Sequence, residues 1–179
     1  MTNLNFFSLD LENNQPSNTI IQTGYVIGNL ESGIIHEKIC RNICVEENID
    51  ERITKLTGIS QEDIDSGISL NEAYEEMRAL HGHYKCFRNP ITWGGGDSLS
   101  LRNALKLDDE KFLFGRRWID AKTLFVSYCF ANNIKHQSGL AKSLRRLDIN
   151  FQGRKHNALD DAYNTFIIYR NLLEKIKLK

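Results

Sequence analysis

The first forty residues carry three segments rich in β-branched and aromatic side chains, separated by Asn, Gly, Ser and Pro. The segments cover residues 4–11, 20–28 and 33–40, and the last two read IIQTGYVIG and GIIHEKIC. This composition is typical of strands. Their short connections predict an antiparallel meander of three strands.

After residue 50 the apolar positions recur at helical spacing. The pattern predicts helices over residues 50–58, 69–84, 98–107, 121–131, 139–147 and 158–175, with short strands at 90–94 and 117–120. Ser69 and Glu72 stand at capping-box spacing, and Gly58 supplies a C-cap signal. Strands that alternate with helices after a meander indicate an α/β domain built on a mixed sheet of five strands.

The composition predicts one globular domain over residues 1–179. The chain is 41% hydrophobic and contains two prolines, with no repeat or low-complexity stretch. No basic region precedes an apolar run near the N-terminus, and no apolar stretch reaches the ~18 residues of a membrane helix. We expect a cytoplasmic protein without membrane contact, whose four cysteines are reduced packing residues.

The formal net charge is zero, but the charges are unevenly distributed along the chain. Residues 1–89 contain 7 Lys and Arg against 14 Asp and Glu, whereas residues 90–179 contain 16 against 9. The basic half permits a local surface for an anionic partner such as nucleic acid. It equally permits charges that intermix once the chain folds.

Two carboxylates interrupt the first apolar strand, in the stretch FFSLDLENN. Asp10 and Glu12 are two residues apart and therefore project from the same face of the strand. Adjacent carboxylates raise each other's pKa unless a cation lies between them. An edge strand with a wet face is the simpler explanation, so a metal site requires further acids that converge on the same point.

One further acid lies in the stretch GRKHNALDDAYNTFIIYRNLL. His156 precedes the last predicted helix, and Asp160 and Asp161 occupy its first turn. At ~100° per residue, Asp161 borders the apolar face of this helix, whereas Asp160 points away from it. The helix dipole explains Asp160, and it explains Asp161 equally well unless other acids lie nearby.

Asp97 follows a predicted strand and three glycines in the stretch ITWGGGDSLSLRNAL. Asp is a common N-cap residue, and capping is the plain interpretation of this position. Three glycines, however, allow a ligand to approach closely at the end of a strand, where α/β sheets place their sites. Trp93 beside them is either a core residue or a surface on which a base stacks.

Taken together and in sequence, these motifs resemble the DEDDh branch of the DEDD three-prime-to-five-prime exonucleases. The residues that carry the resemblance are Asp10 and Glu12, Trp93 and Gly94 with Asp97, and His156 ahead of Asp161. LTGIS at 56–60 and the stretch 139–165 are similar to segments of the group that contains the histone-mRNA three-prime exonucleases and KapD-like proteins, within the superfamily of RNase T and DNA polymerase III epsilon. The sister DEDDy branch has a tyrosine where this chain has Asn157. The resemblance spans nearly the whole chain and implies a ribonuclease H-like fold.

The resemblance implies a metal-dependent exonuclease that hydrolyses phosphodiester bonds from the 3′ end of DNA or RNA and releases nucleoside 5′-monophosphates. Its cofactors would be two divalent metal ions, Mg²⁺ or Mn²⁺, which prefer oxygen ligands. The carboxylates that would hold these ions are Asp10, Glu12, Asp97 and Asp161. His156 would act as the general base toward the attacking water.

Substrate binding is assigned to Asn14 and Ile59 by resemblance. The family commonly has threonine at the position of Asn14, so we expect an altered contact to the terminal nucleotide. The basic residues near the proposed site would receive the phosphate backbone or form an ordinary solvated surface. They are Arg145, Arg146, Arg154 and Lys155.

The implied partner is nucleic acid with a free 3′ end, and a homodimer or a partner protein would supply any further context. An alternative function is a non-catalytic module that binds nucleic acid or a partner on the same fold. A metal-stabilised structural domain is a third alternative, but it would not need a histidine ahead of Asp161.

Overall fold

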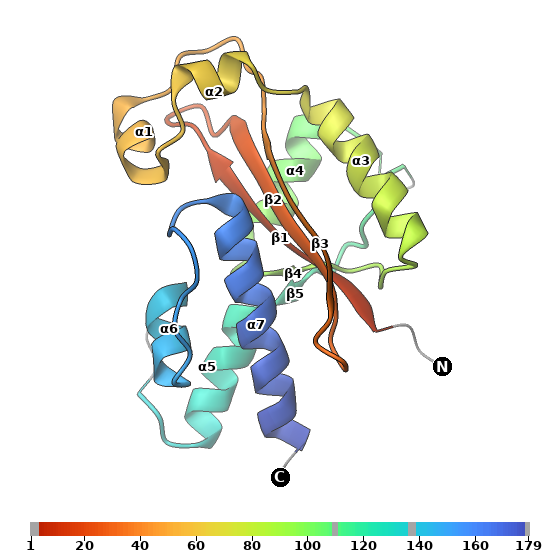
Figure 1. Cartoon of the computed structure of the whole chain (residues 1–179), viewed down its shortest axis with the longest axis vertical. Coiled ribbons are helices and arrows are strands. Elements are labelled where there is room, and N and C mark those ends of the chain that lie inside the picture. Colours follow the sequence, from red (N-terminus) through yellow and green to blue (C-terminus); the bar gives the residue numbers. More distant parts are fainter. Residues whose placement is uncertain (1–3, 109–110, 136–138, 178–179) are drawn as a thin grey trace.

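The sheet contains five strands in the order β3-β2-β1-β4-β5. The computed structural model describes residues 4–108, 111–135 and 139–177. The N-terminal strands β1 (Asn5–Asn13), β2 (Ile20–Asn29) and β3 (Ile35–Asn42) pair antiparallel, whereas β4 (Ile91–Thr92) and β5 (Ile119–Asp120) pair in parallel. The predicted α/β fold, with a mixed sheet and an antiparallel meander, is therefore confirmed (Figure 1).

All six predicted helices are present in the described residues. The helices of the structure are α1 (Glu51–Thr57), α2 (Gln61–Asp65), α3 (Leu70–His83), α4 (Gly96–Leu105), α5 (Ala121–Ala131), α6 (Leu140–Arg146) and α7 (Ala158–Lys177). The capping box of Ser69 and Glu72 and the Gly58 C-cap form as predicted. The sequence pattern does not indicate α2, a five-residue helix whose start is fixed by a capping box between Ser60 and Asp63.

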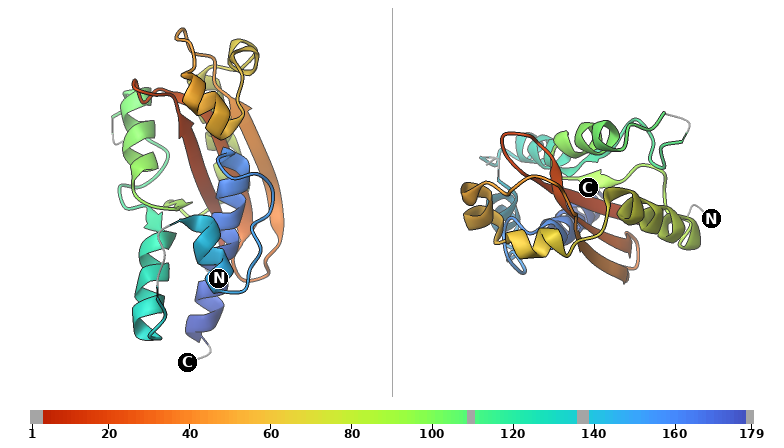
Figure 2. Two further views of the ribbon diagram at one scale, coloured as in Figure 1. Left: turned by 90° about the vertical axis from the view of Figure 1, so that its left-hand side faces the viewer. Right: turned by 90° about the horizontal axis from the view of Figure 1, so that it is seen from above.

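The two faces of β1 meet different parts of the chain because successive side chains alternate. Phe7 and Leu9 are fully buried in the largest core cluster, which includes Met77 of α3 and Leu101 of α4. The opposite face of β1 is turned toward α7, which lies along β1 and β2 with α5 and α6 beside it (Figures 1 and 2). Asp10 therefore lies under the α7 layer rather than in the main core.

No helix of the described residues is both long and apolar enough to cross a membrane. The four cysteines are all unpaired. Cys86 and Cys129 are buried, as expected for packing residues, but Cys44 is exposed.

Candidate active site

Asp10, Glu12 and Asp97 meet because β1 and β4 run parallel. Asp10 and Glu12 lie near the C-terminal end of β1, and β4 pairs with β1 through Ser8 and Ile91. The chain leaves β4 after Thr92, passes through the three glycines and enters α4 with Asp97 in its first turn. The carboxyl ends of neighbouring parallel strands lie at one edge of a sheet, so the three carboxylates are brought together there.

Asp97 does not cap α4, and the capping interpretation of this residue is wrong. The helix begins at Gly96, and its N-cap residue, Gly95, offers no side chain for capping. The Asp97 side chain is thus available to the carboxylate cluster.

The start of α7 is fixed against β2 opposite Asp10. Gly24 is the register partner of Asp10, and the backbone of Ala158 occupies the space that a side chain at residue 24 would fill. The Gln22 side chain accepts a hydrogen bond from the Ala158 N–H at 2.9 Å, which satisfies one of the unpaired donors of the helix start. These contacts bring Asp161, in the first turn of α7, to the carboxylates of β1.

Burial is the largest cause of a raised pKa at all four carboxyl groups. It raises the pKa of Glu12 and that of Asp97 to about 7. The pKa of Asp10 is raised well above its usual range by burial and then by the charges of Asp97, Asp161 and Glu12. Burial also raises the pKa of Asp161, against the hydrogen bond that its carboxylate accepts from the His156 N–H. Carboxylates this close need either protons or cations between them.

His156 stands at the mouth of the cluster, in a left-handed backbone conformation with φ of 60°. Its N–H donates to Asp161 Oδ2 at 3.1 Å, and its side chain is exposed. A ring nitrogen of His156 and one carboxylate oxygen each from Glu12 and Asp161 lie within 4.8 Å of one another. The imidazole is therefore within reach of a reactant held by these two carboxylates.

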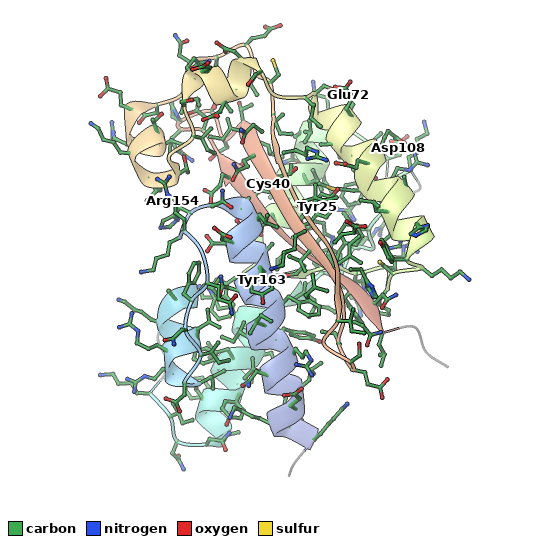
Figure 3. All side chains as sticks on the ribbon, in the orientation of Figure 1. Tyr25, Cys40, Glu72, Asp108, Arg154 and Tyr163 are labelled. Atoms are coloured by element: carbon green, nitrogen blue, oxygen red, sulfur yellow. The ribbon has the colours of Figure 1, made fainter. Side chains whose placement is uncertain are left out.

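The turn that precedes His156 is fixed by contacts with α7 and with the end of α1. Asp160 accepts a hydrogen bond from the Arg154 N–H at 2.8 Å, and its carboxyl group packs against Gly153, where φ is 81°. The Arg154 guanidinium lies over Gly58, at the end of α1 (Figure 3). Asp160 thus fixes the turn before His156, in addition to the favourable interaction with the helix dipole that the sequence predicts.

The cluster fits divalent cations by its donor chemistry. None of the four carboxylates forms an ion pair with a Lys or Arg among the residues described by the structure. Four carboxylates offer oxygen ligands only, which Mg²⁺ and Mn²⁺ prefer. Glu12 and Asp161 have oxygens close enough to share one ion.

A cleft of about 450 Å³ opens beside the cluster. Besides Asp10, His156 and Asp161, its wall contains apolar and basic side chains, namely Trp93, Leu140, Phe151, Lys122, Lys142 and Lys155. Trp93 also packs on Phe125, with ring centroids 6.1 Å apart, so it belongs to the core and to the cleft at once. Sequence reasoning misses Lys122 and Lys142, because only the packing of α5 and α6 against α7 brings them to the cleft.

The side chains of Asn14 and Ile59, which the resemblance assigns to substrate binding, are both buried. Asn14 is only 2% exposed; its amide donates to Glu47 Oε1 and to the Asn48 carbonyl, and its oxygen accepts from the Asp50 N–H. It therefore anchors the segment that enters α1. The side chain of Ile59, 4% exposed, packs in a cluster under α1 and α2.

The predicted basic surface is only partly at the cleft. Lys155 lines it, and Arg154 contacts α1 as described above. Arg145 and Arg146 are exposed in the last turn of α6, where positive charges complement the helix dipole. Neither of them lines the cleft.

Two curated relatives are similar to the chain in sequence. No protein-family profile matches the chain. The chain is 25% identical over 174 residues to ERI1 exoribonuclease 2 of Mus musculus, covering 83% of the chain and 24% of that relative. It is 26% identical over 171 residues to ERI1 exoribonuclease 2 of Xenopus laevis, with 82% and 24% covered. The chain thus spans about a quarter of the length of these relatives.

Solved structures of nucleases share the fold. The nuclease domain of 3'hExo, a DEDDh family member bound to rAMP, superposes with a TM-score of 0.81 at 18% identity, covering 97% of this chain and 94% of that one. A 3'-exonuclease that recognises the 3'-end of a histone mRNA stem-loop gives 0.81 at 19% identity, covering 98% and 84%. S. pombe Pop2p in its Mg²⁺ and Mn²⁺ bound form gives 0.65 at 18% identity, covering 95% and 83%.

By its fold, the chain falls in the class of these solved 3'-exonucleases. Within that class, the resemblance to the DEDDh exonucleases predicted from the sequence is confirmed.

Proposed function

We propose that the protein is a metal-dependent 3′-to-5′ exonuclease that hydrolyses the terminal phosphodiester bond of a nucleic-acid strand and releases nucleoside 5′-monophosphates. The observation that carries the proposal is the convergence of four carboxylates from β1, α4 and α7, with His156 at their edge. The curated relatives are named as exoribonucleases and the similar structures as 3'-exonucleases, which favours the same reaction here.

Two divalent ions, Mg²⁺ or Mn²⁺, complete the proposed site. Asp10, Glu12, Asp97 and Asp161 would hold these ions through their carboxylate oxygens. Such ions, when bound, supply positive charge that stabilises the attacking and leaving oxygens of a phosphoryl displacement. Burial and the neighbouring carboxylate charges raise the pKa of Asp10, which supports a bound cation at the cluster, and so does the Mg²⁺ and Mn²⁺ bound form of Pop2p.

His156 is assigned as the general base. An imidazole is the side chain best suited to proton transfer near neutral pH. Its backbone is tied to Asp161 and its ring is exposed, so a proton taken from the attacking water passes readily to solvent. The turn fixed by Asp160 keeps the ring beside the carboxylates.

The cleft suits the last nucleotide of a strand. Its volume of about 450 Å³ is in the range of small-ligand sites. Trp93 and Phe151 provide apolar surface for a base, and Lys122, Lys142 and Lys155 provide positive charge for phosphate. Both RNA and DNA ligands occur among the similar structures, so the proposed substrate class is a nucleic-acid strand with a free 3′ end.

The test uses single-stranded DNA and RNA oligonucleotides that carry a fluorophore at the 5′ end, incubated with the protein and Mn²⁺ or Mg²⁺. The expected result is a ladder that shortens from the 3′ end, together with nucleoside 5′-monophosphates, and no reaction in EDTA. Intact DNA and RNA with both metals would overturn the proposal and favour a non-catalytic binding module.

A further inference from the structure

Four arginines line a second hollow, outside the carboxylate cleft. The hollow has a volume of about 500 Å³ and lies between the segments that lead into β4 and β5. Its lining residues are Arg88, Asn89, Arg102, Phe114, Gly115, Arg116 and Arg117. No carboxylate is among these described lining residues.

The framework of this hollow is fixed by contacts within the chain. The Gly115 N–H donates to the Arg88 carbonyl at 3.2 Å, and the Asn89 side chain occupies the space that a side chain at residue 115 would fill. The Arg102 guanidinium lies 4.2 Å from the centroid of the Phe112 ring and donates to the Gly115 carbonyl at 3.3 Å. Because the Arg102 side chain is held in this way, it loses little conformational freedom when it binds an anion.

Two of the arginines carry charge that no acid neutralises among the residues whose placement is described. Arg88 and Arg117 are exposed, and neither forms an ion pair within those residues. A guanidinium presents a fork of N–H donors that matches two oxygens of a phosphate.

The arginine hollow continues toward the carboxylate cluster. A neighbouring hollow of about 520 Å³ shares Arg102, Arg116 and Arg117 with it and extends to Gly94 and Gly95, in the turn that precedes Asp97. Arg102 follows Asp97 by five residues along α4, which is a rise of about 7.5 Å. The carboxylate of Asp120 borders this neighbouring hollow, but it accepts N–H bonds from Gly94 and from the start of α5. An arginine-lined track, bordered by Asp120, therefore runs from the Asp97 turn to Arg88.

We infer that this track binds the phosphodiester backbone of the nucleic-acid strand at nucleotides upstream of its 3′ end. The inference rests on the proposed function and extends it, because a track of several guanidiniums matches repeated phosphates rather than one. The terminal nucleotide occupies the carboxylate cleft, and the arginines add affinity only for strands long enough to reach them. Most of this affinity is electrostatic and falls with salt.

The experiment measures binding without turnover, by fluorescence anisotropy in EDTA. The probes are fluorescent single strands of about 3 and about 12 nucleotides, chosen around the site sizes of single-strand binding surfaces. The variant is Arg88→Ala with Arg117→Ala. The matched control is Arg78→Ala with Lys177→Ala, which removes two exposed positive charges from α3 and from the end of α7.

We expect the wild-type protein and the control to bind the longer strand at least about tenfold more tightly than the shorter one. The double arginine variant loses most of this gain, and its slope of log affinity against log salt becomes shallower by about 1.4, the value for two phosphate contacts on a single strand. Charge-conserving Arg88→Lys with Arg117→Lys restores most of the salt dependence.

An unchanged affinity and salt slope in the double arginine variant would overturn the inference. Failure of the proposed function looks different, because the wild-type protein would then show the length-dependent binding but release no mononucleotides when Mn²⁺ is added.

Discussion

Gly24 lies opposite Asp10 in the register of β1 and β2, and the backbone of α7 fills the space above Gly24. Any side chain at residue 24 would push the start of α7 away from the sheet. Because Asp161 is in the first turn of that helix and His156 just before it, one glycine sets the spacing between the two halves of the carboxylate site.

Replacement Gly24→Ala is expected to destabilise the protein by about 2 kcal/mol, since a methyl group has no room against the backbone of α7. It should also lower exonuclease activity, because Asp161 moves relative to Asp10. Urea unfolding and hydrolysis rates check both effects. Gly82→Ala in α3 is the control: apart from the neighbouring residues and the backbone of the helix itself, no atom lies within 4 Å of the added carbon, so stability should rise by up to about 1 kcal/mol. If the two variants were equally stable, α7 would not need a glycine at residue 24.

Asn14→Ala is expected to lower the free energy of unfolding by about 2 to 3 kcal/mol, because it removes the three hydrogen bonds of a buried side chain. The segment that enters α1 loses its anchor, whereas the carboxylates keep their positions. Urea unfolding measures the loss, and Asn103→Ala, at an exposed position of α4, is the control with little change. A variant as stable as the wild-type protein but with altered nucleotide preference would instead support a direct substrate contact by Asn14.

Without divalent ions, the free energy of unfolding contributed by the carboxylate cluster should fall between about pH 5 and pH 7. Glu12 and Asp97 have folded-state pKa values of about 7, above their ordinary values of 4.5 and 3.8. The folded protein therefore holds protons that the unfolded chain has released, and this stabilisation is lost as the pH rises through the folded pKa. Mn²⁺, which binds the ionised carboxylates, should restore stability most strongly at the upper end of this range.

Thermal unfolding in EDTA, compared between wild type and Asp97→Asn, isolates this effect. The comparison is needed because burial lowers the pKa of His81, which makes stability rise with pH in part of the same range. The variant should gain stability relative to the wild-type protein as the pH rises. A difference that does not change with pH would argue against protonated carboxylates in the metal-free protein.

His156→Ala should reduce the rate of hydrolysis by about 10² to 10⁴-fold, the range expected for loss of a general base. The Mn²⁺-dependent rise in melting temperature should persist, because the four carboxylates remain. The two measurements together show whether His156 acts as a general base or is a required metal ligand. A rate of hydrolysis equal to that of the wild-type protein would exclude His156 as the general base.

Much of the fold is predictable from the sequence because its local signals agree with its tertiary structure. The strands of the meander have strong β propensity, and the capping box of Ser69 marks the start of α3. Among the helices of the described residues, α2 alone is missed, since a helix of five residues is too short to show a helical period.

The candidate site is only partly predictable. The alternation of β1 predicts that Asp10 and Glu12 share a face, and the helical period predicts that Asp161 points inward. The roles of Gly24, Gln22 and Lys122 depend on which elements pack together, and no local pattern carries that information. The burial of Asn14 escapes prediction for the same reason, because its three partners lie more than 30 residues away in the chain.

The central claim is that the carboxylate cluster around Asp10 hydrolyses nucleic acid from the 3′ end. Its most direct test compares release of nucleoside 5′-monophosphates by the wild-type protein, by Asp10→Asn and by Asp148→Asn in Mn²⁺. Asp148 is an exposed acid at φ of 60°, a conformation that asparagine tolerates, so its replacement removes the same charge without disturbing the site. We expect rapid release by the wild-type protein and Asp148→Asn and none by Asp10→Asn, whereas equal release by all three proteins would exclude Asp10 from the reaction.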